Sequence, residues 1–182
     1  MTQPGIVLED HRIGLKEGRM AYWETHERFM CAALAEAAIS ATEGNQGVGS
    51  VIVMDGEIIA VGRNLENTEH DPTAHAETVA IRNYAAASAA GSTQESWQEY
   101  ALKPRILAGA TLYSTFEPCP MCCGVILVSG ISTMVLGGRP DPGTTKWGDY
   151  TAERMVEMTS WNDRIKVVTG VLVDECFNAR NV

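Results

Sequence analysis

The sequence predicts an α/β fold in which helices cover both faces of a five-stranded mixed sheet, a three-layer α/β/α sandwich. Helical and strand patterns alternate along the chain, and a strong hairpin signal lies at 48–61. About 27 residues, from 138 to 164, separate the last two strand patterns and contain a helical pattern, so these two strands are expected to be parallel. The hairpin excludes an all-helical fold. A Rossmann fold is disfavoured because no Gly-rich phosphate loop follows the first strand.

The first predicted elements are a helix and a hairpin. Over Glu24–Thr42 apolar residues recur at the helical period, and Gly44 is expected to end the helix. Two β-branched runs, Val48–Met54 and Glu57–Val61, flank the dipeptide Asp55-Gly56. This dipeptide tolerates the positive φ angles of a tight hairpin turn.

The remaining elements follow from the same two periodicities. A second helix is expected from about Thr73 to Ala90, and the polar stretch Gly91–Pro104 is expected at the surface. Shorter strands and helices alternate after it: strand Ala110–Thr115, helix Pro120–Ser129, strand Ile131–Gly137, helix Thr151–Met158 and strand Ile165–Val173. The tail that follows is expected to be helical to Asn181.

Length and composition indicate one globular domain. The 182 residues are 45% hydrophobic and 20% charged, which excludes a disordered chain. We expect an irregular arm over residues 1–23 and a single domain with a short C-terminal tail over 24–182. The net charge of −9 makes a nucleic acid an unlikely main partner, because binding a phosphate backbone needs clustered Lys and Arg. No apolar run approaches the ~20 residues of a membrane span.

Five cysteines indicate a reduced protein with thiolates gathered for a metal or for redox work. Three of the five lie within 119–123, and an odd total does not suit a disulfide framework. The N-terminus also lacks the basic start and apolar stretch of a secretory signal. A cytoplasmic location is therefore expected.

Two short motifs carry the chemistry. His75-Ala76-Glu77 begins the second predicted helix, and Pro118-Cys119-Pro120-Met121-Cys122 begins the third. One imidazole and two thiolates suit Zn²⁺ with its fourth position open. Glu77 lies two residues from His75, on a neighbouring face of the helix, so it is placed to exchange a proton with water rather than to bind the metal. A structural zinc site or a redox dithiol would need no such carboxylate.

The two motifs together resemble the signature of zinc deaminases, H-x-E followed by P-C-x-x-C. From about Glu24 to Val173 the chain resembles the cytidine-deaminase-like superfamily. The stretches Asp71–Glu77 and Glu117–Cys122 are similar to the branch that holds guanine deaminases and bacterial tRNA adenosine deaminases. The resemblance implies a hydrolytic deaminase that binds one Zn²⁺ per chain through His75, Cys119 and Cys122, with Glu77 as the proton carrier. It also implies a homodimer or a larger homo-oligomer.

The resemblance further implies contacts with the substrate. Asn64 matches a position that hydrogen-bonds the base or its sugar, and the backbone N–H of Ala76 would meet the ring. Phe116 is expected to line the pocket. Trp147 and Asp149 lie where guanine deaminases carry an aromatic and acidic stretch over the base. Asp149 is alternatively the N-cap of the following helix.

The expected substrate is a small nucleobase-like molecule, with guanine first. A tRNA-specific adenosine deaminase is the alternative, as are deaminases of cytosine, a nucleoside or a triazine-like base. The preference for a small molecule rests on charge, because the tail Asp174–Arg180 and the loop Arg139–Lys146 carry few basic residues. A third possibility, a non-enzymatic zinc-stabilised scaffold, does not explain Glu77.

Overall fold

The sheet has five strands in the order β2-β1-β3-β4-β5. The computed structural model describes residues 10–90, 96, 98, 105–141, 144 and 146–181. The strands are β1 (Gly49–Met54), β2 (Glu57–Arg63), β3 (Thr111–Phe116), β4 (Thr133–Gly138) and β5 (Lys166–Thr169). Strand β1 is antiparallel to β2 and β3, whereas β3, β4 and β5 are parallel. The predicted mixed sheet and its parallel last pair are confirmed.

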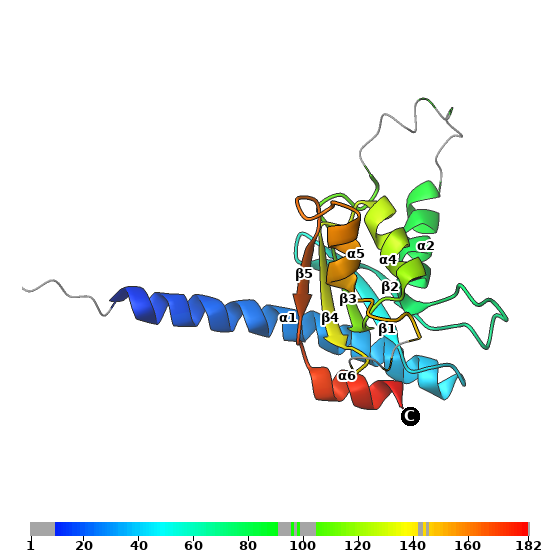
Figure 1. The fold of residues 1–182 in the computed structure, drawn as a ribbon, viewed down its shortest axis with the longest axis horizontal. Helices are drawn as coiled ribbons and strands as arrows, with labels where there is room; N and C mark the ends of the chain where they lie inside the picture. Colours follow the sequence, from blue (N-terminus) through cyan, green and yellow to red (C-terminus); the bar gives the residue numbers. More distant parts are fainter. Residues whose placement is uncertain are drawn as a thin grey trace, which may run out of the picture.

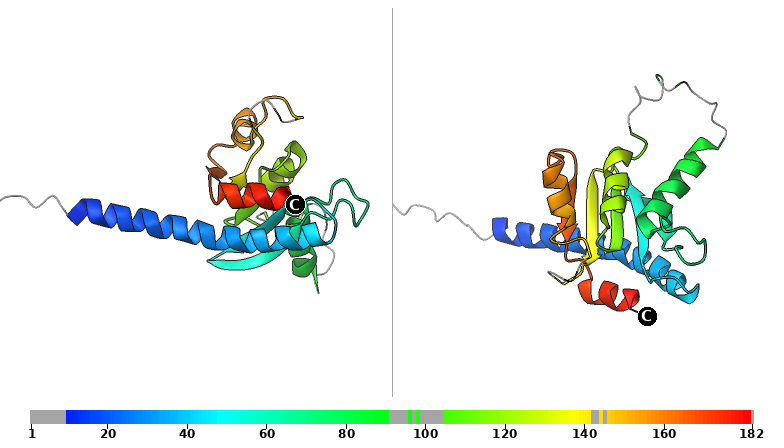
Figure 2. Two further views of the ribbon diagram at one scale, coloured as in Figure 1. Left: turned by 90° about the horizontal axis from the view of Figure 1, so that it is seen from below. Right: turned by 45° about the vertical axis from the view of Figure 1, so that its right-hand side comes forward.

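Helices cover both faces of this sheet (Figure 1). They are α1 (Asp10–Thr42), α2 (Ala76–Ala89), α4 (Pro120–Ser129), α5 (Ala152–Met158) and α6 (Val173–Arg180). Helices α1 and α6 lie side by side on one face (Figure 2). Helices α2, α4 and α5 pack on the opposite face. The three-layer α/β/α sandwich is therefore confirmed.

The strands supply two hydrophobic cores because successive side chains point to opposite faces. On β3, Leu112 enters the core under α2, α4 and α5, while Tyr113 enters the core under α1 and α6. On β4, Met134 and Val135 divide in the same way. This burial on both faces explains why the sequences of the central strands are nearly continuous apolar runs.

The hairpin turn has the geometry that its dipeptide predicts. Asp55 and Gly56 have φ angles of 51° and 80°, so both central residues are left-handed, as a type I′ turn requires. At the end of α1, Gly44 is also left-handed, with φ 84°. Both turn predictions are confirmed.

Helix α1 is longer than the periodicity predicts. It begins at Asp10, so the prediction of an irregular arm is wrong for residues 10–23, and residues 1–9 lie outside the described part of the chain. Gly14 and Gly18 disfavour a helix by only ~1 kcal/mol each, and an established helix propagates through such residues. The N-terminal part of α1 extends away from the sandwich (Figure 1).

The last strand is shorter than predicted, and most of the predicted stretch Gly91–Pro104 lies outside the described residues. Strand β5 ends at Thr169 rather than Val173. Gly170 and Leu172 have φ angles of 87° and 51°, which end the extended conformation, and α6 begins directly afterwards. Among the described residues, no helix is long and apolar enough to cross a membrane.

Strand β2 approaches α2 closely at Gly62. A Cβ at this position would collide with the backbone of Ala76 and Ala80, both in α2. Only glycine therefore lets the strand pack against the helix that begins with the His75-Ala76-Glu77 motif.

We expect Gly62→Ala to lower the free energy of unfolding by roughly 1–3 kcal/mol, because the sheet and α2 must move apart. Chemical denaturation measures the change. Gly124→Ala is the matched control: it lies within α4, a Cβ there meets nothing within 4 Å, and helix propensity favours alanine. A Gly62→Ala protein as stable as the wild type would contradict the close packing.

Candidate metal centre and substrate cavity

Two helix starts carry the His and Cys residues of the motifs. His75 is the N-cap of α2 and Cys119 is the N-cap of α4, both with extended backbone. Pro120 occupies the first turn of α4, where its missing N–H costs no helical hydrogen bond. Cys122 lies in the same first turn, so both sulfurs face one region beside His75.

The three side chains present one compact donor set. The His75 Nδ1 atom lies 3.4 Å from the Cys122 sulfur and 3.6 Å from the Cys119 sulfur. All three ligand atoms lie within 4.8 Å of one another. Zinc–sulfur bonds of about 2.3 Å and zinc–nitrogen bonds of about 2.0 Å place tetrahedral ligands about 3.5 Å apart. The donor set therefore fits a zinc ion with a fourth position open.

The two thiols share a proton between them. The Cys122 thiol donates to the Cys119 sulfur, which lowers the pKa of Cys119 to about 4. The same interaction and burial raise the pKa of Cys122. Cys119 is therefore a thiolate at neutral pH, whereas Cys122 must lose its proton when a metal binds.

The second ring nitrogen of His75 faces a carboxylate. When Nδ1 binds a metal, Nε2 carries the proton of the neutral ring; Nε2 lies 3.6 Å from a carboxylate oxygen of Glu66. Such a carboxylate orients a metal-binding histidine and selects its tautomer. An Asx turn places Glu66, since the Asn64 side-chain oxygen accepts from the Glu66 backbone N–H at 3.1 Å.

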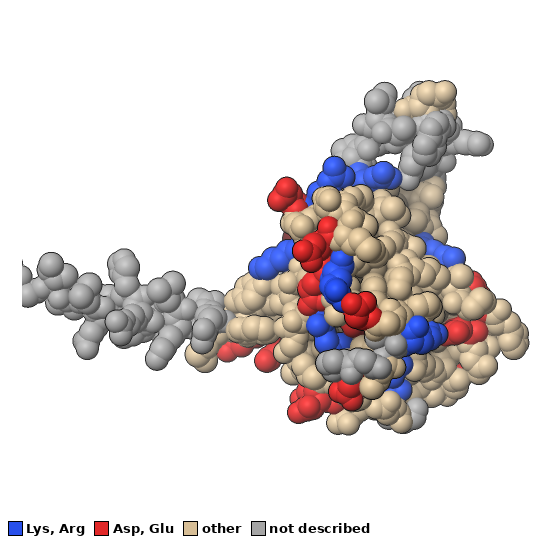
Figure 3. All heavy atoms as spheres, in the orientation of Figure 1, with Lys and Arg blue, Asp and Glu red and all other residues tan. Residues whose placement is uncertain are grey.

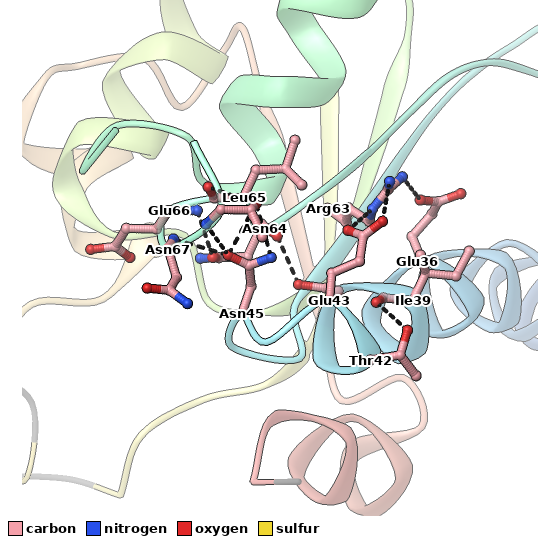
Figure 4. Close-up of polar contacts among 12 residues, drawn as sticks. Glu36, Ile39, Thr42, Glu43, Asn45, Arg63, Asn64, Leu65, Glu66 and Asn67 are labelled. Atoms are coloured by element: carbon pink, nitrogen blue, oxygen red, sulfur yellow. Dashed lines mark hydrogen bonds and ion pairs between the residues drawn. The ribbon is translucent and has the colours of Figure 1, made fainter. Parts of the chain in front are cut away.

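The end of α1 anchors this loop (Figure 4). The Asn45 Oδ1 atom accepts from the backbone N–H groups of Asn67 and Thr68, at 2.9 and 3.1 Å. The Ser40 hydroxyl donates to the Asn64 carbonyl at 2.8 Å. Asn64 is buried, and its Nδ2 group forms no hydrogen bond with the described residues, so it is available to a ligand. The loop is thus held by hydrogen bonds rather than by hydrophobic packing.

Glu77 lies beside the donor set but is not part of it. It is buried, with 3% of its surface exposed, and the Ser114 hydroxyl donates to its Oε1 atom at 2.9 Å. Burial raises the pKa of Glu77. A carboxyl group with a raised pKa is suited to taking up and releasing a proton near neutral pH.

A cavity of about 480 Å³ opens at the donor set. Its wall includes His75, Glu77 and Cys119, together with four of the residues expected to contact substrate: Asn64, Ala76, Phe116 and Trp147. Other lining residues were not singled out by the sequence, and they include Glu66, Glu117, Lys146, Tyr150, Phe177 and Arg180. Glu117 and Tyr150 carry a local signal, because each adjoins a motif that the sequence already shows.

Asp149 does not line this cavity. Its side chain is exposed and pairs with Arg154. The alternative, that Asp149 caps the following helix, is wrong, because Thr151 is the N-cap of α5 and accepts from the Arg154 backbone N–H. The expectation that Asp149 reads a guanine edge loses its support, since the carboxylate already holds an arginine outside the cavity.

Glu117 and Tyr150 fasten the loop after β4 to the cysteine motif. The Tyr150 hydroxyl donates to the Pro118 carbonyl at 2.8 Å. The buried Glu117 carboxylate accepts from the Ala152 N–H at 3.1 Å and lies 3.5 Å from Arg139. Burial raises the pKa of Glu117, while its bond to Ala152 opposes the shift. The cavity wall around Trp147 is therefore tied to the residue before Cys119.

The α/β/α sandwich, the His–Cys–Cys set and the buried glutamate together define the class of zinc-dependent deaminases. The family model for the cytidine and deoxycytidylate deaminase zinc-binding region matches residues 23–138. The chain belongs to this family, and its members are hydrolytic enzymes that act on amino-heterocycles.

The relatives include deaminases of tRNA and of a free base. A tRNA-specific adenosine deaminase of Bacillus subtilis (strain 168) is 36% identical over 150 residues, 82% of this chain and 83% of the relative. A guanine deaminase of the same organism is 42% identical over 102 residues, 56% of each chain. A solved structure from work on A-to-I editing by tRNA:A34 deaminases is 32% identical, with a TM-score of 0.64, and covers 84% of this chain and 98% of its own.

We expect purified protein to hold about one Zn²⁺ per chain and Cys122→Ser to lose it, as metal analysis would show. Binding should release protons, because the Cys122 thiol must ionise, so the apparent affinity for zinc should rise with pH. Cys123→Ser is the control: this neighbour is buried in the hydrophobic core, and burial raises the pKa of its thiol to about 11. Full zinc content in Cys122→Ser would overturn the assignment.

Proposed function

We propose that the chain deaminates an adenosine in tRNA by hydrolysis, with His75, Cys119 and Cys122 as zinc ligands and Glu77 as the proton carrier. The observation that carries the chemistry is the buried Glu77 carboxyl beside an open three-ligand set. A structural zinc ion takes four protein ligands and needs no such group.

Glu77 serves both ends of the reaction. When bound, zinc lowers the pKa of a water molecule to near neutrality. Glu77 would take one proton from that water and deliver it to the ring nitrogen beside the reacting carbon, and would then carry the remaining hydroxyl proton to the amino nitrogen. The new C–O bond replaces the C–N bond, so an amidine and one water become a carbonyl beside a ring N–H, and ammonia leaves. The Ser114 hydroxyl keeps the carboxyl aimed at the cavity.

Two hydrogen-bond donors and the ring of Trp147 are available to hold the base. The Asn64 amide can donate to a ring nitrogen or a sugar hydroxyl, because its oxygen is engaged by Glu66. Ala76 is the first residue of α2, so its backbone N–H has no acceptor within the helix. Phe116 and Trp147 line the cavity, and the exposed ring of Trp147 offers an aromatic face on which a base can stack.

The choice of tRNA rests on the relatives. The tRNA-specific deaminase aligns over more than four fifths of both chains, whereas the guanine deaminase aligns over little more than half. The carboxylate expected to read guanine does not line the cavity. The net charge predicts that a nucleic acid is an unlikely partner; this prediction is not confirmed, because relatives of this chain act on tRNA.

A homodimer and a cytoplasmic location stay predictions.

Deamination of a free purine base such as guanine is the second candidate. The net charge of −9 favours it. In Figure 3, Lys and Arg side chains alternate with Asp and Glu over the described atoms of the visible face, rather than forming a basic stripe. A neutral base needs no such stripe.

Glu77→Gln should keep zinc and fold while losing about 10²–10⁴-fold in turnover, because an amide cannot carry the proton. Ammonia release and metal analysis on the same sample separate the two effects. Glu69→Gln, in the loop before the motif, is the control and should remain fully active. A Glu77→Gln protein with wild-type turnover would remove Glu77 from the mechanism.

The substrate is tested with a panel of a tRNA anticodon stem-loop, adenosine, guanine and cytosine. We expect turnover of the stem-loop, with affinity that falls steeply as salt rises through counterion release. Turnover of a free base should barely respond to salt. Activity on guanine alone, independent of ionic strength, would replace tRNA by the second candidate.

A further inference from the structure

One cation on the cavity wall forms no ion pair in the described part of the chain. Arg180 lies in the last turn of α6 and lines the cavity. Its Nε atom is buried without a hydrogen-bond acceptor. Its guanidinium lies over the ring of Phe116, with Cζ 4.1 Å from the ring centroid, and that ring packs against Phe177, one turn earlier on α6.

Within the described residues, no carboxylate of the cavity forms an ion pair with Arg180: Asp141 also lines the cavity without pairing to it, Glu77 accepts from Ser114, and the other two are engaged elsewhere. Glu117 accepts from Ala152 and faces Arg139, and Glu66 faces His75. The acidic residues of α6 itself are in its first turn, at the opposite end of the helix from Arg180. Burying a charged group without a counterion is unfavourable, and a bound anion removes this penalty.

We propose that Arg180 is an anion-binding residue of the substrate site and holds a phosphate group of the nucleotide substrate. This inference rests on the proposed function. A guanidinium whose central carbon lies over the Phe116 ring can turn its N–H groups toward a ligand, and such a fork can donate two parallel hydrogen bonds to phosphate oxygens. Arginine stays protonated in proteins, so the site keeps its charge. Lys146 adds a second cation to the same cavity.

The test compares ligands that differ by one phosphate. In the Glu77→Gln background, which binds without turnover, calorimetry measures adenosine 5′-monophosphate, adenosine and an anticodon stem-loop. We expect Arg180→Gln to weaken binding of the monophosphate and the stem-loop about 10- to 100-fold and to leave adenosine unchanged. The salt slope for the stem-loop should fall by about 1. The affinity of Arg180→Lys for the monophosphate and the stem-loop should lie between those of the parent and of Arg180→Gln.

Arg28→Gln is the matched control. Arg28 also lies over an aromatic ring, that of Phe29 on α1, and does not line the cavity. It should bind all three ligands as the parent does, and unfolding midpoints and zinc content should agree among the variants.

The outcomes separate this inference from the proposed function. If Arg180→Gln binds the monophosphate as tightly as the parent, or loses adenosine equally, Arg180 holds no phosphate. If the monophosphate effect is found but active protein does not deaminate the stem-loop, the tRNA proposal fails and the phosphate contact stands. If the parent binds neither phosphorylated ligand, the contact is overturned even where a free base is deaminated.

Discussion

Three polar side chains meet in a small volume because two helices begin beside each other on one face of the sheet. His75 precedes α2 and Cys119 precedes α4, and their ligand atoms with that of Cys122 lie within 4.8 Å. An imidazole and two thiols at this spacing are stable together when they share protons or a metal ion. The helix starts add exposed N–H groups, which favour thiolate. The cavity, the loop beside it and Glu77 are all arranged around this meeting point.

The floor and the rim of the cavity are built differently. Glu77 is buried in α2 and receives a hydrogen bond from Ser114 of β3, so the group assigned to proton transfer stands on the rigid sandwich. The rim consists of segments held by hydrogen bonds: Asn45 holds the loop around Glu66, and Glu117 holds the segment that carries Tyr150. A change of rim residues would therefore leave the floor undisturbed, which lets one chemistry serve different substrates.

Much of the fold could be predicted from local patterns. The helix Pro120–Ser129 and the Asp55-Gly56 turn are observed as predicted, because proline, glycine and apolar periodicity act within a few residues. The sequence predicts too short a helix α1, because the glycines in its first half weaken a helix without ending it. It predicts too long a strand β5, because an apolar run does not reveal that Leu172 adopts a positive φ angle.

Some residues of the candidate site can also be predicted from local sequence, and others cannot. Residue type and spacing within two motifs were enough to indicate the zinc ligands and Glu77, because imidazole, thiolate and carboxylate chemistry belongs to the residues themselves. The rest depends on contacts between distant segments, which no local spacing contains. Asp149 looked like a substrate contact, yet its carboxylate pairs with Arg154 outside the cavity. Arg180 gave no signal, and only the packing of α6 against the end of β3 brings its guanidinium over Phe116.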